Sequence, residues 1–137
     1  MVKASLATMC VVLLTAAGAY SQPKVEKGPI QRVAASDAAG MFQSYCAVCH
    51  GKDAKGNGPA ASALTKAPAD LTRLAARNGG TFPDVKVNRY IEGSDEVAAH
   101  GNRDMPMWGE LFRSLNRDTA LLRVQGLNDY LKSLQVK

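Results

Sequence analysis

Apolar residues recur at helical spacing most clearly towards the C-terminal end of the chain. The pattern predicts a helix from Asp118 to about Leu134. Its apolar stripe, with Tyr130 beside it, comprises Ala120, Val124, Leu127, Leu131 and Leu134. We expect this helix to supply one side of the core.

A second helical pattern runs from Asp37 to about Cys49, with Ser36 as a good N-cap and Asp37 in the first turn. Its shared face comprises Met41, Phe42 and Tyr45. We expect this face to meet the last helix in the core.

Two shorter helices are expected between these. One runs from Leu71 to Arg77, is capped by Asp70, and stops at Asn78-Gly79-Gly80. The other has Pro83 at its first helical position and ends at Gly93. In it, an apolar face is formed by Val87, Tyr90 and Ile91.

The stretches 51–69 and 94–109 are rich in glycine and proline or lack periodicity, which predicts loops. Residues 20–35 are interpreted as an extended or mobile leader for the same reason. No strand alternation, βαβ pattern or repeat occurs in the sequence. The sequence therefore predicts one all-α domain over residues 36–137, with four to five helices and long loops.

The N-terminus has the features of a signal peptide over residues 1–19. Lys3 precedes a 16-residue apolar stretch from Ala4 to Ala19. Cleavage is expected after Ala19, or after Ser21 as the alternative. A membrane anchor would need about 20 apolar residues, and Cys10 lies mid-way through the stretch, too early for a lipoprotein. We therefore expect export, most simply to a bacterial periplasm.

Composition adds a constraint on the core. Cleavage after Ala19 would leave 118 residues with 16 Lys and Arg against 12 Asp and Glu, a net charge of +4. These charges are dispersed, which does not favour nucleic-acid binding. Three Phe, four Tyr and one Trp make a thin core for a domain of this size. Something large and apolar is needed to fill the centre.

The sequence Cys46-Ala47-Val48-Cys49-His50 carries the candidate chemistry. C-x-x-C-H is the attachment motif of c-type haem. Because helical residues three and four apart share a face, Cys46, Cys49 and His50 should project to one side. The two sulfurs can then form thioethers with the haem vinyl groups, and His50 can ligate the iron. The backbone carbonyl of Pro59 is our candidate acceptor for the other imidazole nitrogen.

Other interpretations of the motif explain less. A Cys46–Cys49 disulfide would suit an exported protein but gives no reason for His50. A thioredoxin-like redox site would need a βαβ setting. A zinc site would need a second pair of ligands, which His100 alone cannot provide.

Further motifs are spread along the chain: Phe42 four residues before Cys46, Cys46-x-x-Cys49-His50-Gly51, Gly56-Asn57-Gly58-Pro59, Pro68-Ala69-Asp70-Leu71, His100-Gly101, Met105-Pro106-Met107-Trp108-Gly109 and Leu127-Asn128-Asp129-Tyr130-Leu131-Lys132. With these motifs, residues 36–137 resemble a monohaem class I c-type cytochrome, close to bacterial periplasmic members. Such proteins cross their first and last helices at right angles over a small residue in the first helix. At the usual glycine position this chain has Ala38, with Gly40 nearby.

The resemblance implies a methionine as the second axial ligand, because the family places this ligand directly before a proline. Met105-Pro106 matches, while Met107 and His100 remain alternatives. Thioether sulfur is soft and raises the reduction potential. Trp108 is expected either to pack on the haem, with its N–H towards a propionate, or to pack in the core.

We therefore expect a periplasmic one-electron carrier rather than an enzyme, acting as a free shuttle or as a subunit of a redox complex. It would hold one haem c through Cys46 and Cys49, with His50 and Met105 on the iron. The alternative is a haem enzyme or gas sensor with a labile sixth ligand, in which His100 and Arg103 could act.

The expected partners are a reductase, dehydrogenase or oxidase, with no nucleic acid and no stable membrane insertion after signal cleavage. The exposed haem edge should face the loop after the motif, where Lys52 and Lys55 lie, with Lys66 further on. Positive charges there would steer an acidic partner.

Overall fold

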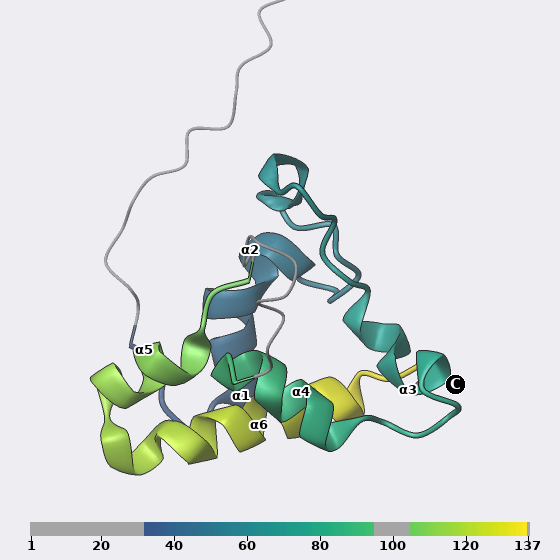
Figure 1. The fold of residues 1–137 in the computed structure, drawn as a ribbon. Helices are drawn as coiled ribbons and strands as arrows, with labels where there is room; N and C mark the ends of the chain where they lie inside the picture. Colours follow the sequence, from purple (N-terminus) through teal and green to yellow (C-terminus); the bar gives the residue numbers. More distant parts are fainter. Residues whose placement is uncertain (1–31, 95–104, 137) are drawn as a thin grey trace, which may run out of the picture.

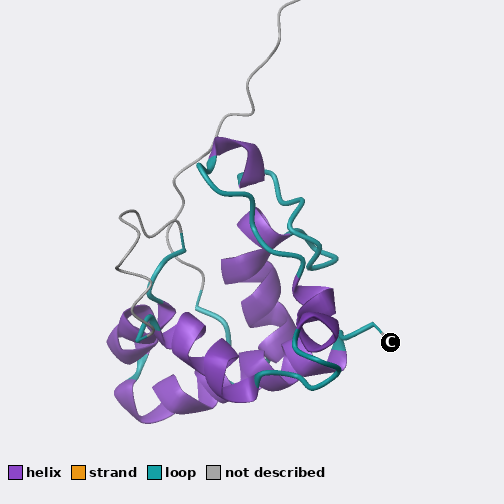
Figure 2. Cartoon of the chain, turned by 45° about the vertical axis from the view of Figure 1, so that its right-hand side comes forward, coloured by secondary structure: helices purple, strands orange, loops and turns teal. Residues whose placement is uncertain are grey.

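The computed structural model describes residues 32–94 and 105–136. The predicted signal peptide, most of the predicted leader, His100 and Arg103 lie outside these residues. The described part contains helices and loops and no strand (Figure 2), which confirms the all-α prediction. Its α-helices are α1 (Ala38–Met41), α2 (Ala47–His50), α3 (Leu74–Arg77), α4 (Asp84–Glu92), α5 (Trp108–Leu115) and α6 (Ala120–Ser133).

The first predicted helix is continuous over residues 38–50, but a π-helical turn at Phe42–Cys46 separates α1 from α2. In this turn the N–H of Ala47 bonds the carbonyl of Phe42, five residues back. The predicted cap Ser36 is wrong by one residue. Asp37 is the N-cap, because its carboxylate accepts the Gly40 N–H at 2.8 Å.

The next two predicted helices are present with small changes. Asp70 caps a 3₁₀ turn at Leu71–Arg73 that leads into α3, as predicted. Pro83 is the N-cap of α4 rather than its first residue, and Gly93 ends α4 in the left-handed conformation at φ +78°. Tyr90 does not share the buried face of α4; it is 40% exposed, with the Lys86 ammonium 6.0 Å from its ring centroid.

Helix α5 lies partly in the predicted loop 94–109 and was not predicted. Its apolar residues have helical spacing, so a signal was present in Trp108, Leu111, Phe112 and Leu115. Gly109 suggests a helix break, but in the structure it allows α5 to pack closely against the end of α4. A β-carbon at Gly109 would lie 2.7 Å from the carbonyl oxygen of Glu92.

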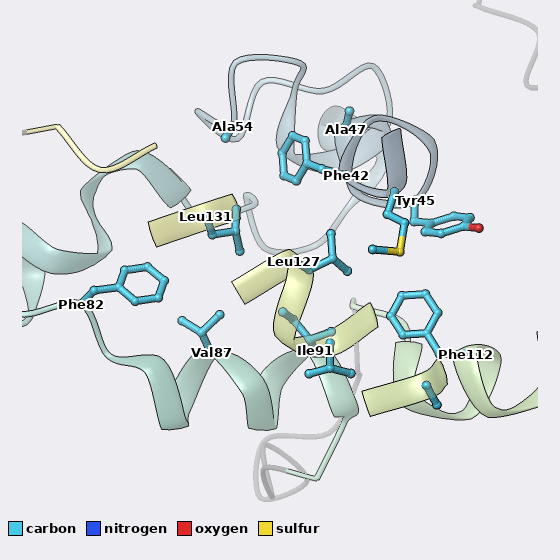
Figure 3. Close-up of a cluster of buried hydrophobic side chains, with 13 residues drawn as sticks. Phe42, Tyr45, Ala47, Ala54, Phe82, Val87, Ile91, Phe112, Leu127 and Leu131 are labelled. Atoms are coloured by element: carbon cyan, nitrogen blue, oxygen red, sulfur yellow. The ribbon is translucent and has the colours of Figure 1, made fainter. Parts of the chain in front are cut away.

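Helix α6 (Figure 1) carries four residues of the predicted stripe, Ala120, Val124, Leu127 and Leu131, and Leu134 is its C-cap. Leu127 lies between Phe42 and Ile91 (Figure 3). Phe42 also contacts Tyr130, with their ring centroids 5.5 Å apart. The buried cluster is completed by Met41, Tyr45, Ala47, Ala54, Phe82, Val87, Phe112, Ala120, Val124 and Leu131.

The helix crossing expected from the resemblance is made by small residues on both partners. A β-carbon at Gly126 of α6 would lie 3.7 Å from the Ala38 Cβ of α1. Alanine can therefore stand at the usual glycine position of the first helix because glycine faces it from the last.

Val33, which falls within the predicted leader, packs on the helical domain. The Val33 N–H donates to the Tyr45 hydroxyl at 3.2 Å, and the Val33 carbonyl accepts from the Arg123 guanidinium at 2.7 Å. Arg123 is only 8% exposed, so this bond partly compensates its burial.

Candidate functional site

The motif residues lie where the π turn passes into α2. Cys46 is the last residue of the turn, and Cys49 and His50 end α2. Both cysteines are free thiols and partly buried. The predicted candidates Cys46, Cys49 and His50 are thus held on one short, rigid element.

The loop after the motif binds back onto the C-terminal end of α2. The N–H groups of Gly56, Gly58 and Ala60 donate to the carbonyls of His50, Cys49 and Val48, at 2.7, 3.0 and 2.9 Å. A β-carbon at Gly58 would lie 2.5 Å from the Val48 carbonyl oxygen. These contacts satisfy helix-end carbonyls that would otherwise lack partners, and they fix the motif residues in place.

The imidazole of His50 is held by Ala69, not by Pro59. Nδ1 of His50 lies 3.1 Å from the carbonyl oxygen of Ala69. The predicted Pro59 acceptor is therefore wrong. The N–H groups of its neighbours Gly58 and Ala60 bind carbonyls at the end of α2, and this pairing fixes the backbone at Pro59. Sequence spacing could not reveal Ala69, which is 19 residues from His50.

This hydrogen bond determines the tautomer of His50. A carbonyl oxygen only accepts, so Nδ1 carries the proton and Nε2 keeps its lone pair. Burial lowers the pKa of His50, and the bond to Ala69 opposes this only in part. A neutral imidazole with a free Nε2 is the form that binds a metal.

The thiols are in a neutral, apolar setting. Burial, with a smaller contribution from Cys49, raises the pKa of Cys46 to about 12. Burial also raises the pKa of Cys49. Thiolates are therefore disfavoured here, which argues against a reactive redox cysteine. A neutral thioether suits the same surroundings, so the residues present fit covalent haem attachment.

The two candidate methionines have different environments. Met107 is the N-cap residue of α5 and packs on Gly93, whose β-carbon, if present, would lie 2.5 Å from the Met107 Cγ. Met105 is partly buried in the bend just before α5. Met107 is thus engaged in packing between α4 and α5, while His100 lies outside the described residues.

Trp108 belongs to an aromatic cluster at the start of α5. Its ring centroid lies 5.6 Å from that of Tyr45 and 6.3 Å from that of Phe112. These contacts support the core-packing interpretation of Trp108 and leave its predicted role towards a propionate untested.

The lysines of the predicted docking face are exposed. Lys52 and Lys55 lie in the loop that wraps α2, and Lys66 lies further along the chain. Lys55 pairs with Asp53 at 3.7 Å, with both side chains well exposed. Such a pair contributes little to stability, but it reduces the local positive charge.

Within the described residues, no group of three or more His, Cys, Asp or Glu side chains is placed to hold a metal ion. The same residues include no helix with the length and hydrophobicity needed to cross a membrane.

Comparison with protein-family models finds a match over residues 33–117 to the family described as cytochrome c oxidase, cbb3-type, subunit III. The matched range contains Cys46, Cys49, His50 and Met105. Comparisons with curated proteins and with solved structures give no match.

Proposed function

The chain belongs to the family described as cytochrome c oxidase, cbb3-type, subunit III, and from this premise we propose that it carries single electrons in the periplasm through one haem c ligated by His50 and Met105. Family and fold identify a monohaem class I c-type cytochrome, an electron-transfer haem protein with redox partners. The compartment, the covalent linkage and the ligand pair are our proposal.

The bound haem would supply a one-electron ferric/ferrous couple. Cys46 and Cys49 would hold it through thioethers, which remain uncharged in their apolar surroundings. His50 would offer Nε2, and Met105 its sulfur, as ligands of the iron. Two ligands supplied by the protein would keep small molecules off the iron, as a carrier requires.

The hydrogen bond between His50 Nδ1 and the Ala69 carbonyl is the observation that carries this proposal. It leaves the ring neutral and Nε2 free, and it holds the ring orientation. The placement of Cys46, Cys49 and His50 on one short helical element gives further support, because all three would have to reach the same haem.

The optical spectrum of the oxidised protein tests the proposal. A low-spin, six-coordinate ferric haem with a weak near-red sulfur-to-iron band is expected for His50 and Met105. A high-spin ferric haem that readily binds added ligands would contradict the carrier and indicate a haem enzyme or gas sensor. As a carrier, the protein would exchange electrons with a reductase, dehydrogenase or oxidase, either as a free shuttle or as a subunit of a redox complex.

A further inference from the structure

The segment Ala69–Thr72, which holds His50, is itself held at every backbone carbonyl. The Ala69 carbonyl accepts from His50 Nδ1 at 3.1 Å, and the Asp70 carbonyl accepts from the Arg77 guanidinium. The next two carbonyls, of Leu71 and Thr72, accept from Gln135 and Val136 at 2.8 and 3.0 Å. The support of the imidazole therefore extends to residues that follow α6.

Gln135 makes the central contact of this arrangement. Its side-chain nitrogen donates to the carbonyls of Leu71 and Leu131, at 2.8 and 2.7 Å. Its side-chain oxygen accepts the N–H of Ala75 at 2.9 Å. All three bonds are made by a partly buried side chain, and two of them join the end of α6 to the turn at Leu71 and to Ala75 of α3. Figure 1 shows the C-terminal end of the chain beside α3.

We propose that Gln135 is a positioning residue for His50: it holds the Ala69–Thr72 segment against the end of α6 and so sets the hydrogen bond at Nδ1. This inference rests on the proposed role of His50 as an iron ligand. A well-made bond from Nδ1 to a carbonyl increases the basicity of the imidazole. A more basic imidazole ligand favours ferric iron and so lowers the reduction potential of the haem.

Removal of the Gln135 amide would leave the Leu71 carbonyl and the Ala75 N–H without their partner. The segment would then be held to the region after α6 by the Val136 N–H, and to the motif loop by the bond from Leu71 N–H to the Ala54 carbonyl at 2.8 Å. The Ala69 carbonyl would move more freely, and its bond to His50 would weaken.

The experiment compares haem-loaded Gln135→Met with wild type, because methionine has a similar length and no amide. Exchange of the His50 Nδ1 proton with solvent, followed by NMR in the reduced protein, is expected to be about fivefold faster, the factor for one lost hydrogen bond. The reduction potential should rise. Gln135→Glu keeps the acceptor for Ala75 but loses both donors, so it should give changes in the same direction if Gln135→Met cannot be obtained.

Gln125→Met is the matched control, since Gln125 is another glutamine near the C-terminal end, within α6, and its amide donates to Asp129 at 2.9 Å, away from the segment. It should leave both measurements unchanged. If the Gln135 variants lose thermal stability while the exchange rate and potential stay at wild-type values, the inference is overturned and Gln135 is only structural. Failure of the proposed ligation would appear separately, in the wild-type spectrum.

Discussion

Met107 packs so closely on Gly93 that a β-carbon at Gly93 would lie 2.5 Å from the Met107 Cγ. This contact joins the end of α4 to the start of α5, two residues after Met105. The contact supports a packing role for Met107 and, with it, our proposal that Met105 is the methionine on the iron.

Met105→Ala should therefore convert the oxidised haem to a high-spin form or to one ligated by water or histidine. The potential should fall markedly, because the soft sulfur is lost. Met107→Ala should keep the sulfur band and lower stability by about 1 kcal/mol, since Met107 is partly exposed. Optical spectra and redox titration measure both. Loss of the band in the Met107 variant alone would reverse our ligand assignment.

Replacing Cys46 and Cys49 together with serine should abolish covalent haem attachment, and each single replacement should leave at most one thioether. Without haem, the fold should be largely lost, because the core is thin for a domain of this size. Denaturing electrophoresis with haem staining tests attachment, and circular dichroism tests the fold. A stained band in the double variant would be incompatible with c-type attachment.

Charge reversal at Lys52 and Lys55 should slow electron transfer to an acidic redox protein and flatten its dependence on ionic strength. The pair Lys86→Glu with Arg89→Glu on α4 makes the same change in net charge on another exposed element. Stopped-flow electron-transfer rates across a salt series compare the two double variants. Equal effects from both would mean that the rate depends on net charge and not on the position of this loop.

Asp70 should contribute to the acid sensitivity of the protein. Hydrogen bonds from Thr72, foremost from its hydroxyl, lower the pKa of Asp70 below its ordinary 3.8, and nearby Arg77 and Arg73 add to this. Because the folded-state pKa is the lower one, the stabilisation is present above pH 3.8 and is lost as pH falls through the folded value.

Asp70→Asn keeps an oxygen acceptor for the cap but removes this charge. Wild type should be more stable than the variant near pH 6, and the difference should shrink below about pH 4. Thermal unfolding of the haem-loaded proteins across this range measures the difference. A constant gap between pH 6 and pH 3 would show that the carboxylate charge plays no part.

Gly126→Ala should stabilise the protein by about 0.5–1 kcal/mol, since glycine is unfavourable inside a helix. The added methyl would meet Ala38 at 3.7 Å, an ordinary contact distance. Gly126→Leu should overfill the crossing and destabilise the protein by about 1–3 kcal/mol. Denaturant unfolding measures the stability of both variants. Destabilisation by alanine would mean that α1 and α6 pack too closely to admit one more methyl group.

The sequence predicts α4, α6 and the motif helix well because their apolar spacing and end signals agree with the packing. Four of the five predicted α6 stripe residues are buried as expected, Ala120, Val124, Leu127 and Leu131. The candidate residues Cys46, Cys49 and His50 could likewise be identified from the sequence, since they lie within five consecutive positions.

What the sequence could not predict depends on contacts between distant residues. Gly109 is typical of a helix break, and only its close approach to Glu92 shows why glycine stands within α5. The acceptor for His50 was misassigned to Pro59 because Ala69 comes into reach only through the turn capped by Asp70. The π turn at Phe42–Cys46 has no comparable sequence signal.

The Gln135 hydrogen bonds connect positions 60 and 64 residues apart, to Ala75 and Leu71. Such long-range contacts form late in folding because a large loop must close first. We therefore expect the region around His50 to close last in folding, after the helix that carries Cys46 and Cys49 has formed.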